Sequence, residues 1–343
     1  MASTGRPTDA AGRGGATIAR IAELAGVSTA TVSKVVNGHA EVAPVTRALV
    51  EKVIREHGYR RQKKPNRATL VELVLHELEG AYAMEVIKGV ERVASEHELA
   101  VVLTELHGRH TPGRTWIEGV LARKPAGVIT VFSAPNPAQQ AQLASRGIPF
   151  VLVDPTSDPG QEFPTVGTSN WNGGLSATRH LLDLGHRRIA AITGPSHALS
   201  SRARLDGFRA ALDAAEVPVD PELVRVGDFN VVDGLAHGRD LLRLDDRPTA
   251  IFAFNDAQAI GVYQAAHEAG LRIPQELSVV GFDDLPPARW AIPALTTVRQ
   301  PLSDMAAAAA DMIVGLTQDT PPAQPRIMLA TELVVRASTA PPA

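Results

Sequence analysis

Short, strongly apolar runs alternate with stretches of helical periodicity over most of this 343-residue chain, and no other feature constrains its fold as much. The runs read LVELVLHEL, AVVLTE, GVITVFS, FVLVD, RIAAITG, AIFAFND and LSVVGFDD. Apolar residues recur at helical spacing over residues 83–98, 114–122, 138–146, 201–215 and 257–269. Such repeats of strand and helix predict a parallel sheet with helices on both faces.

The expected strands number about ten, which is too many for one compact sheet here. We therefore predict two doubly wound, Rossmann-like α/β lobes. The N-terminal lobe should comprise residues 70–184 and 299–325, and the C-terminal lobe residues 185–298 and 326–340. In such folds ligands bind beyond the carboxyl ends of the strands, so polar residues at those ends are candidate site residues.

Residues 17–59 carry a different pattern, with apolar residues at helical spacing in three short segments. Helices are expected over Ile18–Ala25, Thr29–Val36 and Val45–His57, and Gly26 allows a tight turn between the first two. This arrangement predicts a small all-α helix-turn-helix domain, whose second helix enters the major groove of DNA. A helical corner without a binding task is the alternative.

The charge of the chain is unevenly distributed. Residues 1–67 contain 12 Lys and Arg against 5 Asp and Glu, whereas the remainder contains 22 against 32. A basic head on an acidic body is typical of a protein whose head binds nucleic acid, and an incidental basic tail is the alternative. Residues 1–16 are expected to form a disordered tail. Residues 60–69, RRQKKPNRAT, should form a basic hinge or linker that adds DNA affinity without sequence information.

Two segments of the head, IAELAGVSTATVSKVVNG and VTRALVEKVIREHGY, closely resemble the DNA-binding domain of the LacI/GalR (lac repressor) family. The resemblance implies that three residues of the second helix read bases, namely Thr29, Ala30 and Lys34. It implies that others touch or order backbone phosphates, namely Thr17, Ser28, Thr31, Ser33, Asn37, Thr46 and Tyr59. Ala43 departs from the family, which usually has Ser there, so one phosphate contact is expected to be missing.

The linker departs from the same family. The resemblance implies a hinge helix that forms on DNA and inserts a Leu into the minor groove. Pro65 and Asn66 match the family, but the next apolar residue, Leu70, begins the first expected strand. We therefore expect a short hinge without a free wedge, and weaker bending of the DNA.

The body resembles the same family along NGGLSATRHLLDLGHRRIAAITGP, SRARLDGFRAAL and PTAIFAFNDAQAIGVYQAAHEAGLRIPQELSVVGFDDLP. This resemblance implies an effector-binding core similar to periplasmic sugar-binding proteins. It also implies a ligand clamp of Arg204, Asn255 and Asp283, with Asn172 in place of an Asp. A guanidinium opposed by a carboxylate and an amide suits a polyhydroxylated ligand. An ion pair between the lobes, joining Arg204 to Asp283, is the alternative.

Aromatic residues make up 4% of the chain, so their placement at expected strand ends is informative. Four such residues are candidates for stacking on a sugar ring: Tyr82, Phe132, Trp171 and Phe229. Packing in the core or at an interface is the alternative for each of them.

Several classes of protein are excluded or disfavoured. The absence of cysteine excludes disulfides and thiolate metal sites, and no apolar run approaches about 18 residues. The first 16 residues lack the apolar core of a secretory signal, so a cytoplasmic location is expected. We find no phosphate-binding loop, nucleophile elbow or zinc motif. An enzyme would rest on the Asp pairs alone, so we predict no catalytic residues, metal or cofactor.

These observations predict a sequence-specific transcriptional regulator, namely a repressor of carbohydrate uptake or metabolism genes. A sugar effector between the lobes would change its operator affinity allosterically. No leucine heptad follows the body, so a homodimer on a pseudo-palindromic operator is expected, without a membrane contact. A purine or nucleoside effector is the alternative within this class. A solute-binding protein is the alternative outside it, although such a protein has no use for the head.

Overall fold

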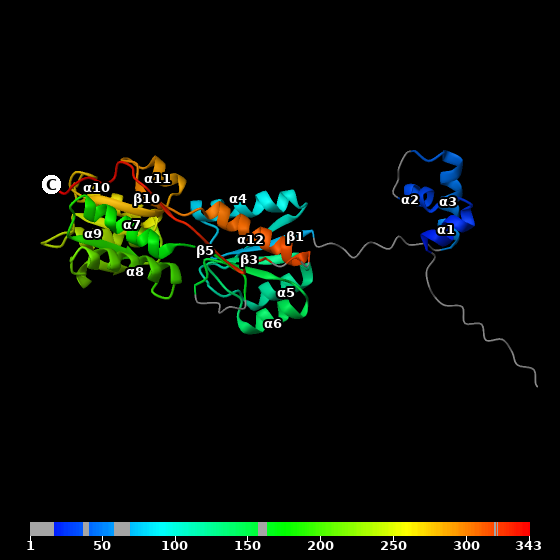
Figure 1. Ribbon diagram of the computed structural model, residues 1–343, viewed down its shortest axis with the longest axis horizontal. Helices are drawn as coiled ribbons and strands as arrows, with labels where there is room; N and C mark the ends of the chain where they lie inside the picture. Colours follow the sequence, from blue (N-terminus) through cyan, green and yellow to red (C-terminus); the bar gives the residue numbers. More distant parts are fainter. Residues whose placement is uncertain (1–16, 37–40, 58–68, 157–162, 319, 321) are drawn as a thin grey trace, which may run out of the picture. The chain divides into compact units, whose positions relative to one another are not determined.

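The computed structural model describes residues 17–36, 41–57, 69–156, 163–318, 320 and 322–343. The chain divides into two compact units, residues 1–67 and 68–343, which are here called the head and the body (Figure 1). The expected tail and nearly all of the expected linker lie outside the described residues. No helix among the described residues is long and apolar enough to cross a membrane.

The head contains three helices: α1 (Ile18–Ala25), α2 (Thr29–Val36) and α3 (Pro44–Glu56). The bounds of α1 and α2 are those predicted, and α3 begins one residue earlier because Pro44 suits the first helical position. The side chain of Thr17 caps α1, and Gly26 ends it in the left-handed conformation. The apolar faces of all three helices meet in one small core of Ile21, Ala22, Ala25, Val32, Val35, Val50 and Val53.

The N-terminal lobe of the body is built on a six-stranded parallel sheet of order β11-β5-β4-β3-β1-β2. Its strands are β1 (Leu70–Leu75), β2 (Ala100–Glu105), β3 (Gly127–Val131), β4 (Phe150–Val153), β5 (Thr165–Thr168) and β11 (Arg326–Leu329). Helices α4 (Gly80–Glu96) and α12 (Leu302–Thr317) cover one face. Helices α5 (Arg114–Arg123) and α6 (Pro137–Ser145) cover the other. Leu70 pairs with Ala100, so it belongs to the first strand as expected.

The C-terminal lobe has a sheet of order β12-β10-β9-β8-β6-β7, in which only β12 runs antiparallel to its neighbour. Its strands are β6 (Ile189–Thr193), β7 (Val224–Val226), β8 (Ala250–Ala253), β9 (Ser278–Asp283), β10 (Thr296–Arg299) and β12 (Glu332–Val334). Helices α7 (Asn170–Asp183) and α8 (Leu199–Ala214) cover one face. Helices α9 (Val231–Leu242) and α10 (Asp256–Glu268) cover the other. The 3-10 turn Pro221–Leu223 and the short helix α11 (Pro286–Trp290) lie in connections.

The chain passes between the two lobes three times, and this corrects two expected boundaries. Helix α7 packs on the C-terminal lobe, although the expected N-terminal lobe ran to residue 184. Strand β11 pairs with β5 in the N-terminal lobe, although residues 326–340 were expected in the other. Periodicity identifies a helix or strand but not the sheet that it joins. Hydrogen bonds hold the crossings together, since the amide of Ser169 donates to the carbonyl of Leu329 at 2.9 Å.

Candidate nucleic-acid interface and ligand cavity

Helix α2 presents the three predicted base-reading residues on one exposed face. Thr29, Ala30 and Lys34 are exposed, while Val32 and Val35 point into the core of the head. The Lys34 ammonium lies 2.8 Å from a carboxylate oxygen of Glu41, and both side chains are more than half exposed. Because both groups are exposed, this ion pair is weak, and Lys34 can leave it to donate to a base edge.

The residues predicted to touch phosphates lie mainly at helix starts. Thr17 caps α1, and the Ser28 hydroxyl accepts the Thr31 amide at 3.1 Å and lies 2.9 Å from the Thr31 hydroxyl. Amide groups at helix starts favour anions, so these positions suit phosphate contacts. Thr46 and Ser33 are half-buried. Asn37 and Tyr59 lie outside the described residues.

Ala43 occupies the N-cap position of α3 and supplies no side-chain hydrogen bond there. Serine, which the family usually has, would cap this helix. Ala43 therefore lies at a helix start, where a serine hydroxyl would cap the helix, and the loss of a phosphate contact there stays a prediction.

The body contains a cavity of about 260 Å³ between its two lobes. Its walls come from segments that follow the carboxyl ends of strands, as expected for doubly wound lobes. Six of the eight predicted effector residues line it: Tyr82, Phe132, Arg204, Phe229, Asn255 and Asp283. The predicted ligand clamp is therefore brought together in space from helix α8 and from the ends of β8 and β9.

Trp171 and Asn172 do not line the cavity, and these two expectations are corrected. Both are exposed residues of α7, and Trp171 is 44% exposed. The helical register explains this, because the buried face of α7 contains Asn170, Gly173 and Gly174. Asn170 is the amide of this segment that contacts Arg204, since its Oδ1 accepts Nε of Arg204 at 2.8 Å.

Arg204 is the centre of the cavity floor and is 3% exposed. Its guanidinium also donates to the carbonyl of Phe254 and lies 3.6 Å from the ring centroid of Phe282. Burial lowers the pKa of Arg204, while Asp283 and Asp154 oppose this shift. Arg204 thus has two donors committed to the protein and others available to a ligand.

The alternative of an ion pair between the lobes is wrong. Arg204 and Asp283 both belong to the C-terminal lobe, and no ion pair within 4.0 Å joins them among the described residues. The two groups therefore flank the cavity without neutralising each other directly, which leaves both able to bind a ligand.

Asp283 ends strand β9 and accepts a hydrogen bond from Nε2 of Gln300 at 2.6 Å. Burial raises the pKa of Asp283 to about 7, although Arg204 and Gln300 oppose the shift. Both Asp283 and the next residue, Asp284, have positive φ angles, of 115° and 58°. This sharp bend lets the first carboxylate line the cavity while the second enters a separate network.

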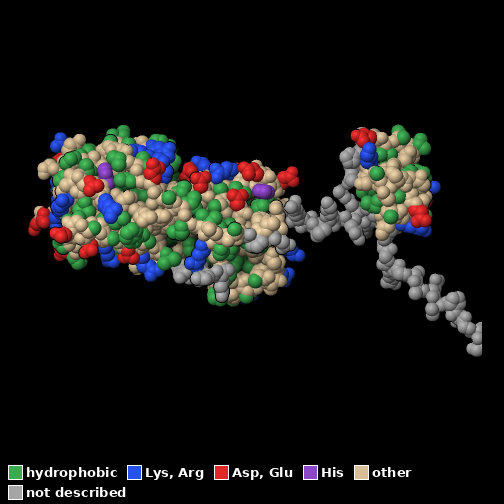
Figure 2. Space-filling model, viewed as in Figure 1, with side chains coloured by type: hydrophobic (Ala, Val, Ile, Leu, Met, Phe, Trp, Pro, Cys, Tyr) green, Lys and Arg blue, Asp and Glu red, His purple; other side chains and the backbone are tan. Residues whose placement is uncertain are grey.

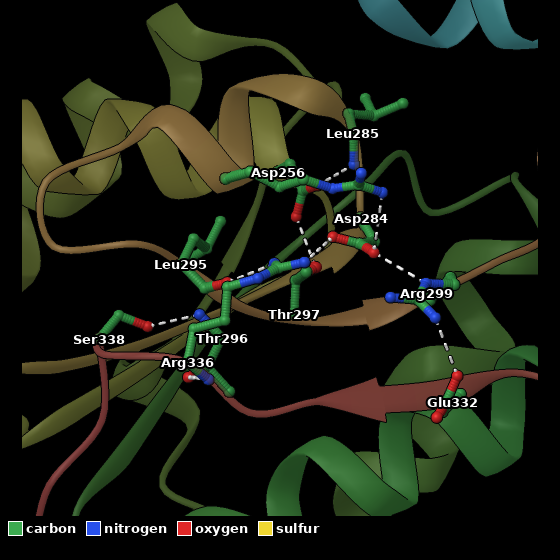
Figure 3. A network of polar contacts seen from close by, with 11 residues as sticks. Asp256, Asp284, Leu285, Leu295, Thr296, Thr297, Arg299, Glu332, Arg336 and Ser338 are labelled. Carbon is green, nitrogen blue, oxygen red and sulfur yellow. Dashed lines mark hydrogen bonds and ion pairs between the residues drawn. The ribbon is translucent and has the colours of Figure 1, made fainter.

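That network anchors the end of β9 (Figure 3). Asp284 accepts from Arg336 and, at 2.8 Å, from Nε of Arg299, which also contacts Glu332 at 3.1 Å. Arg299 precedes one lobe crossing and Glu332 follows another. The hydrogen bonds thus tie the cavity wall to the segments about which the lobes can move.

Sequence reasoning missed three buried polar residues: Asn170, Asp154 and Gln300. Asp154 lines the cavity, and burial raises its pKa. It directly follows FVLV, just as Asp283 ends its own strand, so the position at a strand end was a usable signal. Gln300 follows β10 in the same manner. No group of three or more His, Asp or Glu among the described residues could hold a metal ion.

Two aromatic rings join the lobes across the cavity. Phe132 and Phe229 meet edge to face with ring centroids 6.0 Å apart. His76 and His110 stack at 4.3 Å beside Phe132. Burial raises the pKa of Tyr82, so this residue contributes an apolar face and a neutral hydroxyl. Sugars bind well to walls of this type.

Comparison with known proteins finds relatives of both the head and the body. Residues 17–62 match the family model of the bacterial regulatory proteins of the lacI family, and residues 178–339 match the periplasmic binding protein-like domain. The ribose operon repressor of Escherichia coli (strain K12) is 32% identical, covering 94% of this chain and 99% of its own. The transcriptional repressor PurR of Edwardsiella ictaluri (strain 93-146) is 34% identical over 87% and 89%.

Two solved structures are similar throughout. A complex of the transcriptional regulator CelR with cellobiose has a TM-score of 0.72 and 32% identity, over 94% of this chain and 99% of that one. The lac repressor dimer bound to operator and the anti-inducer ONPF has a TM-score of 0.73 and 28% identity, over 95% and 99%. The similarity therefore covers head and body together.

Proposed function

Because the chain belongs to the LacI family of bacterial regulatory proteins, and so is a DNA-binding transcriptional regulator and not an enzyme, we propose that it represses carbohydrate uptake or metabolism genes in the cytoplasm. A sugar bound between the lobes changes its affinity for operator DNA. The observation that carries this proposal is the cavity floor, where Arg204, Asp283 and Asn255 offer donors and acceptors beside aromatic walls.

The mechanism requires that the effector bind two conformations of the body with different affinity, because a ligand without such a preference shifts nothing. Residues from both lobes line the cavity, so a sugar that contacts both favours their closure. Two copies of the chain place two α2 helices on a pseudo-palindrome whose half-sites are centred about one helical turn, ~10 bp, apart. The lobe movement alters how the two heads are held and so changes operator affinity.

A purine or nucleoside effector is the second candidate, and the similarity to PurR favours it. Arg204 and Asp283 serve either ligand, since both present polar edges. Calorimetric titration of the purified protein with neutral sugars, and separately with purine bases and nucleosides, distinguishes the two candidates. If a purine binds and no sugar does, the effector is a purine and the sugar proposal is wrong.

The first experiment measures binding of the purified protein to the DNA upstream of its own gene, with and without a panel of neutral sugars. Lys34→Ala should weaken specific binding by about 1–3 kcal/mol if Lys34 reads a base. Lys52→Ala is the matched control, because it removes the same charge from an exposed site on α3. Equal loss in both variants, or binding that only fades with salt, would leave the head as a non-specific DNA binder.

A further inference from the structure

The cavity is lined by an unbalanced set of charges. Five carboxylates belong to its walls: Glu77, Glu79, Asp154, Asp228 and Asp283. Arg204 is the one Lys or Arg side chain among the lining residues that the structure describes. On the face of the body shown in Figure 2, by contrast, acidic and basic side chains are interspersed.

The carboxylates occupy two levels of the cavity. Asp154 and Asp283 are buried on the floor, whereas Glu77 and Glu79 from the N-terminal lobe and Asp228 from the C-terminal lobe are exposed. Carboxylates therefore stand on both lips of the cleft. Movement of the lips toward each other brings like charges together, and a ligand that adds negative charge increases this repulsion.

A buried acceptor without a partner lies on the same wall. Gln300 is 3% exposed, and its Nε2 donates to Asp283. Its Oε1 is buried and has no hydrogen-bond partner among the described residues. An unpaired buried acceptor is costly, so this atom favours a ligand that donates a hydrogen bond to it. Together with the carboxylates, it makes the lining rich in acceptors.

The one guanidinium is only partly free to hold an anion. Two of its donors are committed to Asn170 and to the carbonyl of Phe254, and the ring of Phe282 covers one face. A phosphate or carboxylate is held best by a free planar fork of two parallel donors. In addition, burial raises the pKa of both Asp154 and Asp283, which shows that the floor already disfavours negative charge.

We propose that the cavity selects a ligand without negative charge that is rich in hydroxyl or amino donors, which Gln300 and Asp283 accept, and that it excludes phosphorylated and carboxylated counterparts. The inference deepens the proposed function, because it names the chemical class of the effector at the same site. It predicts a regulator that responds to a free sugar before phosphorylation or oxidation of that sugar.

The test uses calorimetry on the full chain with matched pairs of ligands. The pairs are cellobiose with cellobionate, ribose with ribose 5-phosphate, glucose with glucose 6-phosphate, and adenosine with AMP. The expected result is that whichever neutral member binds does so at least about 30-fold more tightly than its anionic partner. An anionic member that binds as tightly as its neutral partner would overturn the inference.

A variant that removes one negative charge tests whether electrostatic repulsion causes this selectivity. Asp228→Asn should narrow the ratio between the neutral and anionic affinities about three-fold or more, since it removes one lip charge. Asp206→Asn is the control, because Asp206 is exposed on α8 and does not line the cavity. An unchanged ratio in Asp228→Asn would contradict the electrostatic explanation. Binding of adenosine but not AMP would support the exclusion of anions while it rejected the sugar, so the two proposals fail separately.

Discussion

The head and the cavity of the body are the two candidate binding sites, and they are built in opposite ways. The predicted base-reading residues of the head are exposed and fall within six positions of one helix, Thr29 to Lys34. The cavity gathers buried residues that are more than two hundred positions apart, from Leu75 to Gln300. A site on one helix depends on local register, whereas the cavity depends on packing. Substitutions should therefore affect the two sites independently.

The largest effect is expected for Arg204→Lys. The lysine loses the planar fork and leaves the oxygens of Asn170 and Phe254 without their donors, at a cost of about 1–3 kcal/mol for each unsatisfied acceptor. Effector binding should be lost, while operator binding by the folded protein should persist. Calorimetry and a gel-shift assay measure the two.

The exposed Arg209 on the same helix provides the control for that variant. Arg209→Lys should leave both activities near their original values. If a folded Arg204→Lys protein lost operator binding, the two sites would not be independent.

The second largest effect is expected for Gly174→Ala, which disturbs the packing that positions Arg204. A Cβ added at Gly174 would lie 2.2 Å from the carbonyl oxygen of Arg204, so α7 and α8 can approach only with glycine there. Gly174→Ala should destabilise the body by about 1–3 kcal/mol and weaken effector binding. Gly113→Ala, which meets no atom closer than 3.7 Å, loses only the preference for glycine at the N-cap of α5 and should cost clearly less. Thermal unfolding compares them, and equal melting temperatures would contradict the argument.

A smaller effect on effector binding is expected when the pH is changed. The pKa of Asp283 is raised to about 7, and its ionised form is the better acceptor for a ligand hydroxyl. Effector binding should therefore be about tenfold weaker at pH 6 than at pH 8. The native carboxyl holds its proton between about pH 4 and 7 while the unfolded one does not, so the contribution of this group to stability falls as pH rises through that window.

Asp283→Asn should flatten the pH dependence of effector binding. Operator binding by the head in the absence of effector should lack this dependence, because Asp283 belongs to the body. A slope that survives in Asp283→Asn would assign the titration to another group, and Asp154 would be the first to examine since its pKa is also raised.

The smallest effect is expected in the head. Ala43→Ser should cap α3 and stabilise it by about 1 kcal/mol. The new hydroxyl should also tighten operator binding slightly, and effector binding should not change. Ala43→Val provides no hydroxyl and is the comparison, because valine caps as poorly as alanine. Equal melting temperatures of the serine and valine variants would show that the position makes no capping contact.

Much of the head followed from the sequence because its signals are local. Apolar spacing, the Thr17 cap and the Gly26 stop act within a few residues, and the expected bounds of α1 and α2 agree with the structure. In the body, continuous apolar runs identified the buried strands in the same way. The short strands β5, β7, β10, β11 and β12 were missed, because each has only three or four residues and these include polar ones.

The tertiary structure alone decided which segments meet. Trp171 and Asn172 carried the right chemistry, but the register of α7 turned them outward and placed Asn170 against Arg204. The same holds for β11, whose sheet is set by hydrogen bonding with β5. The sequence determined the residue types, the local elements and the head. Contacts between distant segments are set by the packing of whole lobes, and no short pattern encodes them, so the make-up of the cavity required the structure.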